Sequence, residues 1–187
     1  MAMPRVGEPA PDFELPCDTG QLIRLSKLRG STVVLYFYPR DDTPGCTVEA
    51  CGFRDSLEDF HSLPTVQNAN TPGCTTEACG FRDAYADYRQ NAVQVLGISP
   101  DSVASHAKFR DKFALPFPLL ADEGHAVASA YGVWGPKTFM GRNYEGVLRT
   151  TFLIGPDGRL LRIYENVKPD GHSAQILADL LGAEASG

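Results

Sequence analysis

The chain has 187 residues, 43% of them hydrophobic and 21% charged, which is the composition of an ordinary globular protein with one domain. Its formal net charge of −6 excludes a basic surface of the kind that binds nucleic acid. The longest apolar run, at residues 33–38, is far shorter than the ~20 residues of a membrane-spanning helix. Residues 1–11 lack the apolar centre of a signal peptide. We therefore expect a cytoplasmic protein with neither a nucleic-acid nor a membrane partner.

The first half of the chain predicts an N-terminal β-hairpin followed by buried strands. Residues 12–17 and 21–25 flank a turn that contains Gly20, which is the pattern of a hairpin. A continuous apolar and aromatic run over residues 32–38 predicts a central strand that is covered on both faces. Residues 93–99 have the same pattern and predict a second strand of this kind.

The second half predicts alternating helices and strands. The expected elements are a helix over 102–114, a short strand over 116–120, a short helix over 125–131, a hairpin of 147–154 and 159–165, and a last helix over 172–181. The turn of this hairpin is Gly155-Pro156-Asp157-Gly158. The whole pattern is typical of an α/β domain in which helices flank a mixed sheet.

Residues 43–55 recur almost unchanged at 71–83, with only Val48 replaced, by Thr76. Each copy places apolar side chains at helical spacing, so the segments 43–60 and 71–88 each predict an amphipathic helix. No third copy follows. We interpret the repeat as a local duplication within a single domain of residues 1–187, and not as a repeat array.

Cys46 lies at the expected start of the first of these helices. Thr43 is suited to be the N-cap residue, and Pro44 to be the first helical residue. The free N–H groups and the positive dipole end of a helix start stabilise a thiolate, which is the nucleophilic form of cysteine. Glu49, one turn further on, opposes this effect, so we expect another cation beside Cys46.

The sequence around Cys46 is similar to that of a known enzyme family. Residues 36–46 (YFYPRDDTPGC) and 49–55 (EACGFRD) resemble the active-site region of peroxiredoxins, in the peroxiredoxin Q or bacterioferritin-comigratory branch. The segments 99–102, 115–122, 131–135 and 149–154 resemble the same branch in the same order. The resemblance implies a thioredoxin-like fold. It also implies reduction of hydrogen peroxide and organic hydroperoxides without a metal, haem or flavin, and recycling by a thioredoxin- or glutaredoxin-type reductant.

By matching position, the resemblance makes Cys46 the attacking cysteine and Cys51 the resolving cysteine, with Pro39, Thr43 and Arg149 around the peroxide. Cys46 would then be oxidised to a sulfenic acid and captured as a disulfide. Residues five apart in an intact helix are separated by about 8.7 Å between Cα atoms. Since a disulfide needs less than about 7 Å, we predict that the first turns unwind after oxidation.

The second copy offers Thr71, Cys74 and Cys79 as alternative site residues. We favour the first copy because Pro39 precedes Thr43 at the family spacing, whereas Gln67 holds the equivalent position before Thr71. One of the two helices should pack on the sheet, and the other should lie displaced with an exposed aromatic stripe. Such a stripe favours self-association, so we expect a monomer or a weak homo-oligomer.

Two other functions agree with the cysteine pattern. Cys-x4-Cys-x22-Cys-x4-Cys supplies four thiolates, enough for a zinc-binding module. Alternatively, the duplication has disrupted the pocket and left a non-catalytic scaffold. A thioredoxin-type reductase is disfavoured because the sequence has no Cys-x-x-Cys. We expect Cys17 to be inert and half-buried. Surface or capping positions are expected for the histidines, which are His61, His106, His125 and His172.

Overall fold

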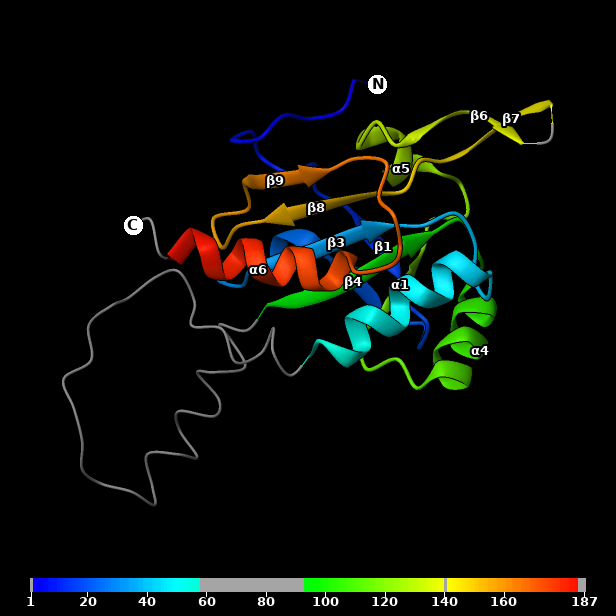
Figure 1. Cartoon of the computed structure of the whole chain (residues 1–187), viewed down its shortest axis with the longest axis horizontal. Coiled ribbons are helices and arrows are strands. Elements are labelled where there is room, and N and C mark those ends of the chain that lie inside the picture. The colour runs from blue at the N-terminus through cyan, green and yellow to red at the C-terminus, as the bar shows by residue number, and fades with distance from the viewer. Residues whose placement is uncertain (1, 58–92, 140, 185–187) are drawn as a thin grey trace, which may run out of the picture.

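The computed structural model describes residues 2–57, 93–139 and 141–184, which are built around a five-stranded mixed sheet (Figure 1). In spatial order the strands are β5 (Leu119–Ala121), β4 (Gln94–Ser99), β3 (Val33–Phe37), β8 (Thr150–Ile154) and β9 (Leu160–Tyr164). β3, β4 and β5 run parallel, whereas β8 is antiparallel to β3, and β9 to β8. The predicted mixed sheet is confirmed.

The central strand β3 is buried along its whole length, as its apolar run predicts. Val33, Leu35 and Phe37 point into the core on one face, while Val34 and Tyr36 point into the core on the other. This alternation follows from the two-residue period of a strand. β3 therefore separates the two halves of the core.

Helices and a hairpin cover the two faces. Side chains of α1 (Pro44–Asp55), α4 (Val103–Phe113) and α6 (His172–Glu184) contribute to the core on the Tyr36 face. On the other face lie α5 (Ala126–Ala130), the hairpin of β1 (Glu14–Pro16) and β2 (Leu22–Arg24), and the 3-10 helix η1 (Leu25–Leu28). The helix α1 buries Ala50 and Phe53, the stripe expected for the first copy of the repeat.

The predicted hairpin near the C-terminus is formed by β8 and β9. Its turn is closed by a hydrogen bond of 2.8 Å from the Gly158 amide to the Gly155 carbonyl. Gly158 has a φ of 76°, a left-handed conformation that glycine adopts without steric cost. The Gly-Pro-Asp-Gly sequence therefore marks this turn correctly.

A second hairpin, of β6 (Trp134–Phe139) and β7 (Arg142–Val147), is absent from the sequence-based assignment. Figure 1 shows it projecting from the body of the molecule. Gly135 and Pro136 interrupt the alternating pattern that identifies strands, so the hairpin gives only a weak signal. Strand β5 also begins later than predicted, at Leu119, because Pro116 and Pro118 have no N–H to donate.

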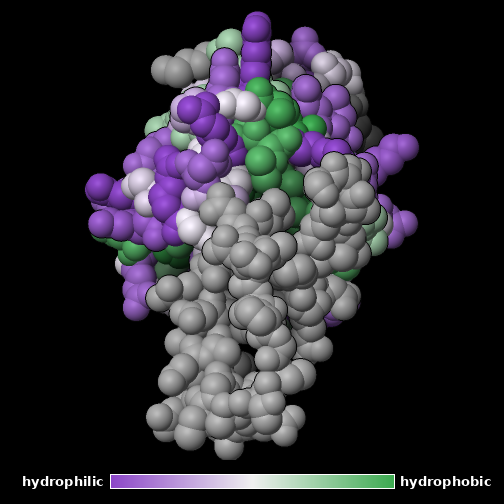
Figure 2. Space-filling view, turned by 90° about the vertical axis from the view of Figure 1, so that its left-hand side faces the viewer, coloured by the Kyte–Doolittle hydropathy of each residue, from purple (hydrophilic) through white to green (hydrophobic). Residues whose placement is uncertain are grey.

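The second copy of the repeat, including Thr71, Cys74 and Cys79, lies outside the described residues, as does the end of the first copy at 58–60. The predictions of a displaced helix and of one domain over residues 1–187 therefore stay predictions. In the described ranges, no helix combines the length and the apolar composition that a membrane span requires. Figure 2 shows one face of the molecule, where a band of hydrophobic residues is bordered by hydrophilic ones.

Candidate active site

The start of α1 has the form that the sequence predicts. Thr43 is the N-cap residue with extended backbone angles, and Pro44 occupies the first turn. One detail differs: the Thr43 side chain does not cap the helix, and its hydroxyl instead donates to the Arg40 carbonyl at 3.2 Å. The amides of the first turn therefore receive no side-chain cap from Thr43 and remain available to stabilise an anion.

Cys46 is buried in this first turn and is only 1% exposed. Nη2 of Arg149, just before β8, lies 3.1 Å from the Cys46 sulfur. Arg149 is the further cation that the opposing charge of Glu49 led us to expect. Burial by itself would lower the pKa of Arg149, but the neighbouring Glu49 and Cys46 outweigh it and raise that pKa. The guanidinium therefore stays charged beside the sulfur.

Glu49 lies one turn beyond Cys46 on the buried face of α1, and its side chain is completely inaccessible to solvent. Its Oε2 forms an ion pair with Nη1 of the same Arg149. Burial raises the pKa of Glu49 to about 7, against the opposing influence of Arg149. The other oxygen, Oε1, has no hydrogen-bond partner among the described residues. The site thus contains two acids, Cys46 and Glu49, that share one arginine.

Lys137 on β6 is a second basic side chain in this region, which the sequence reasoning missed. Its Nζ donates to the Val147 carbonyl at 2.9 Å. Burial lowers the pKa of Lys137, the positive Arg149 lowers it further, and Cys46 opposes both effects. The lysine is therefore within electrostatic range of Cys46 and Arg149. Because it belongs to the hairpin that the pattern did not reveal, no sequence signal pointed to it.

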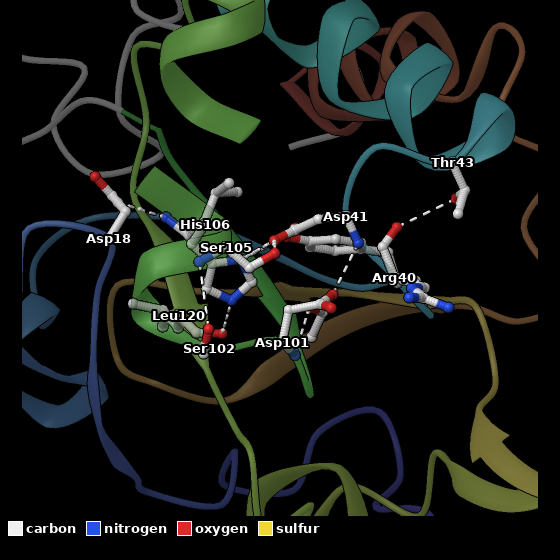
Figure 3. A network of polar contacts seen from close by, with 12 residues as sticks. Asp18, Arg40, Asp41, Thr43, Asp101, Ser102, Ser105, His106 and Leu120 are labelled. Atoms are coloured by element: carbon white, nitrogen blue, oxygen red, sulfur yellow. Dashed lines mark hydrogen bonds and ion pairs between the residues drawn. The ribbon is translucent and has the colours of Figure 1, made fainter. Parts of the chain in front are cut away.

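A buried polar network holds the loop between β3 and α1 (Figure 3). The Asp41 carboxylate accepts hydrogen bonds from the Tyr38 hydroxyl and the Ser105 hydroxyl, both at 2.7 Å. Nδ1 of His106 lies 2.9 Å from the same carboxylate, and its Nε2 lies 3.1 Å from the Leu120 carbonyl. Although burial opposes it, hydrogen bonding by His106 and Ser105 lowers the pKa of Asp41. The network fixes the backbone on which Pro39 and Thr43 lie.

The other expected site residues of the first copy lie in the loop before α1 and on α1 itself. Pro39 is partly buried in this loop, and Cys51 is a free, half-buried thiol on α1, the same helix as Cys46. Cys17 is buried, with 3% exposure, so the expectation of a half-buried residue was wrong in degree. The thiol of Cys17 lies 3.0 Å from the Thr19 hydroxyl, which gives it a local partner.

The expectation of surface or capping positions was wrong for two of the histidines. His106 is 0% exposed and His172 is 3% exposed. Each can be buried because a polar group faces it: Asp41 and the Leu120 carbonyl for His106, and the Thr151 hydroxyl for His172. His125 occupies the N-cap position of α5, and His61 lies outside the described residues.

Comparison with known proteins shows which family the chain resembles. The profile of the AhpC/TSA family matches residues 6–67 and 63–163, so each match contains one copy of the repeated motif. The chain is 41% identical to peroxiredoxin Bcp of Bacillus subtilis over 175 residues, which covers 94% of each chain. It is 35% identical to peroxiredoxin Bcp of Escherichia coli K12 over 173 residues, covering 92% of this chain and 93% of the relative.

Solved structures give the same result for the fold. The structure resembles a PrxQ mutant of Xylella fastidiosa with a TM-score of 0.75 at 29% identity, covering 100% of this chain and 99% of the other. It also resembles the bacterioferritin comigratory protein of Xanthomonas campestris, with a TM-score of 0.70 at 30% identity, covering 91% of each chain. The predicted thioredoxin-like fold is confirmed by these neighbours.

Proposed function

The chain belongs to the AhpC/TSA family as a peroxiredoxin, a thiol-dependent peroxidase, and from this premise we propose that Cys46 attacks the hydroperoxide and Cys51 resolves it. The observation that carries the proposal is the contact of 3.1 Å between Arg149 Nη2 and the buried Cys46 sulfur. A guanidinium in this position stabilises the thiolate and offers donors to the peroxide.

In the first step, the Cys46 thiolate attacks the terminal oxygen of the hydroperoxide. A sulfur–oxygen bond forms while the oxygen–oxygen bond breaks, and negative charge develops on the departing oxygen. Arg149, which contacts the Cys46 sulfur, and the Cys46 amide in the first turn of α1 would stabilise this charge, as preorganised donors do. The Thr43 hydroxyl, which donates to the Arg40 carbonyl in this structure, would have to turn toward the peroxide to join them. The products are a sulfenic acid on Cys46 and an alkoxide or hydroxide, which takes up one proton to become an alcohol or water.

In the second step, the Cys51 thiol attacks the sulfenic acid, which releases water and forms a disulfide. Cys46 and Cys51 both lie in α1, which spans Pro44–Asp55 without a break. Their Cα atoms are therefore about 8.7 Å apart, beyond the reach of a disulfide of about 7 Å. The first turns of α1 have to unwind before the bond forms.

The substrate and the reductant are proposed by likeness to relatives. The Xanthomonas campestris protein, which covers 91% of this chain, is described as having alkyl peroxide reduction activity. We extend this activity to alkyl hydroperoxides and hydrogen peroxide here. A thioredoxin- or glutaredoxin-type dithiol would return the Cys46–Cys51 disulfide to two thiols.

Replacement of each cysteine tests the assignment. Cys46→Ser should abolish peroxide consumption, because serine supplies no thiolate. Cys51→Ser should leave the first oxidation intact and stop turnover with a disulfide-specific reductant. Cys74→Ser is the matched control, since Cys74 has nearly the same sequence neighbours, and it should retain activity. Peroxide consumption and mass spectrometry of labelled thiols measure these outcomes. An inactive Cys74→Ser variant beside an active Cys46→Ser variant would reverse the assignment.

The two alternative functions predict different results in the same experiments. A zinc-binding module requires stoichiometric zinc, which metal analysis of the purified protein detects. The contact of Arg149 with the Cys46 sulfur disfavours it, because a guanidinium beside a thiolate repels a metal cation. A non-catalytic scaffold would consume peroxide once per thiol without saturable turnover.

A further inference from the structure

Glu49 has no assigned task in the steps above, although it lies next to the reacting sulfur. It is three residues after Cys46, which places both side chains on the same face of α1. Arg149 connects them, with Nη2 on the Cys46 sulfur and Nη1 on Glu49 Oε2. The site is therefore a cluster of two acids and one cation, enclosed in the core on the Tyr36 face of the sheet.

Around Arg149, which contacts both acids, the charges balance when Cys46 and Glu49 hold one proton between them. A thiolate and a carboxylate together would place two negative charges against one guanidinium in a buried environment, where an uncompensated charge is costly. A thiolate with a neutral carboxylic acid leaves an equal pair of charges. Oε1 of Glu49, which has no partner among the described residues, also favours the neutral form, since a bare buried carboxylate oxygen is expensive.

The groups that surround the cluster do not supply a second full positive charge to Glu49. From β3, Tyr36 faces it as a neutral phenol, because burial, then Glu49 and then Cys46 raise the Tyr36 pKa far above its usual value. From α6, His172 stays neutral more readily, since burial lowers its pKa and Arg149 lowers it further. Lys137 from β6 donates to the Val147 carbonyl, and its charge acts on Cys46 and Arg149, whereas the charged neighbour of Glu49 is Arg149. In the described part of the chain, Arg149 forms the ion pair with Glu49.

We propose that Glu49 is a catalytic residue: as a neutral carboxylic acid it gives its proton to the oxygen that leaves when the Cys46 thiolate attacks the hydroperoxide. This inference rests on the proposed function of Cys46. Burial raises the pKa of Glu49 to about 7, so the carboxyl can hold and release a proton at neutral pH.

The proton transfer accompanies cleavage of the oxygen–oxygen bond. The thiolate electron pair forms the sulfur–oxygen bond with the terminal OH oxygen, and the oxygen–oxygen bond breaks with its electron pair on the leaving oxygen. Cys46 becomes a neutral sulfenic acid, the leaving alkoxide takes the Glu49 proton and departs as an alcohol, and Glu49 becomes a carboxylate. Cys46 sulfur is oxidised and the peroxide is reduced, with no other reactant. The negative charge moves from the sulfur to Glu49, and both positions contact Arg149.

The test compares two oxidants that differ in their need for this proton. Cumene hydroperoxide releases a strongly basic alkoxide, whereas perbenzoic acid releases a weakly basic carboxylate. Glu49→Gln keeps an oxygen that can accept from Arg149 but removes the acidic proton. Oxidation of Cys46 in a single turnover is followed by rapid quenching and mass spectrometry. Ultraviolet absorbance of the thiolate confirms that the nucleophile is equally ionised in both proteins.

Glu49→Gln should slow the reaction with cumene hydroperoxide by about 100-fold, a usual contribution of general acid catalysis, and should hardly change the reaction with perbenzoic acid. Equal losses with both oxidants would show that Glu49 only positions Arg149 and would overturn the proposal, as would no loss with either. Asp55→Asn is the matched control, because it removes an exposed carboxylate from the same helix. Failure of the Cys46 assignment is recognised separately, by activity in Cys46→Ser.

The wild-type protein provides a second readout that does not depend on folding of the variant. As the pH rises through about 7, Glu49 loses its proton. The rate with cumene hydroperoxide, divided by the rate with un-ionised perbenzoic acid, should then fall. A ratio that is constant across this range contradicts the proposal.

Discussion

At the residue scale, His106 is buried between two hydrogen-bond acceptors. Nε2 lies 3.1 Å from the Leu120 carbonyl, and a backbone carbonyl can only accept a hydrogen bond. Nδ1 faces the Asp41 carboxylate at 2.9 Å, and a carboxylate also only accepts. The side chains of His106 and Asp41 therefore form a buried, coupled pair. Tyr38 and Ser105 complete the donors to this carboxylate.

Removing both partners of this pair should destabilise the protein by less than the sum of the two single losses. His106→Leu leaves the Asp41 charge buried without its imidazole partner, at a cost of about 3–5 kcal/mol in unfolding free energy. Asp41→Leu likewise leaves the buried His106 side chain without its carboxylate partner. The double variant should lose less than the sum, and urea denaturation measures the difference. Strictly additive losses would mean that the two side chains are not coupled.

The control for this cycle lies on the same loop and helix. Lys112 Nζ pairs with Asp42 at 2.6 Å, but both side chains are about half exposed. Lys112→Met should change the unfolding free energy by less than about 1 kcal/mol, as is usual for exposed ion pairs.

The sequence predicted the charges around Cys46 better than it predicted which polar side chains are buried. The position of Glu49 one turn after Cys46 predicted a cation, and the structure supplies Arg149. The identity of Arg149 came from the family resemblance, because no spacing rule connects residues that are so far apart in the sequence. The burial of His106 was not predictable, since its partners come from a loop and from β5, which only the tertiary fold brings together.

At the element scale, α1 is held at both of its ends. Before the helix, the Asp41 amide donates to the Asp101 carboxylate at 2.8 Å. At its end, the Ser56 hydroxyl donates to the Ser173 hydroxyl on α6 at 3.3 Å. These anchors lie on either side of Cys46 and Cys51. The unwinding that a disulfide requires is therefore expected to stay between them.

Hydrogen exchange should reveal this local change. In the disulfide form, amides of the first turns of α1, after Pro44, should exchange faster than in the reduced form, because their helical hydrogen bonds are lost. Amides of β3 and α6 should keep their protection. Reduction should restore the slow exchange. Equal protection of α1 in both forms would contradict the helix geometry on which the prediction rests.

The elements that the sequence predicted are those with a strong local pattern. β3 was found from a continuous apolar run, and the β8–β9 hairpin from a glycine-rich turn with alternating flanks. The β6–β7 hairpin was missed, since its residues are largely exposed and contain glycine and proline. Pairing between its two strands contributes to its stability and leaves little trace in hydropathy. Lys137, which this hairpin carries, was missed with it.

At the scale of the whole molecule, the candidate site lies where segments that are distant in sequence meet. Cys46 and Glu49 come from α1, Arg149 precedes β8, and Lys137 belongs to β6. The sheet order β4-β3-β8 brings the start of α1 and the start of β8 to the same end of the sheet, because β8 runs antiparallel to β3. Local patterns predicted the individual strands. The strand order of the sheet, which brings these residues together, followed only from the family resemblance.

The buried Glu49 should make the stability of the folded protein depend on pH. Its pKa is raised from 4.5 to about 7 by burial. The folded state therefore binds more protons than the unfolded state between these values, so this contribution to stability is present below pH 4.5 and is lost as the pH rises through about 7. Glu49→Gln removes this pH-dependent contribution to stability. Burial lowers the pKa of His172, which changes stability with pH in the opposite direction, but this effect is the same in the variant and the wild type.

The difference in unfolding free energy between Glu49→Gln and the wild type should consequently shift in favour of the variant as the pH rises. A pKa shift of this size corresponds to at most about 3 kcal/mol between the two ends of the range. Urea denaturation of the reduced proteins at intervals between these pH values measures the shift. A difference that stays constant with pH would mean that Glu49 titrates alike in the folded and unfolded chains. The neutral carboxylic acid required for proton donation would then not be present near pH 7.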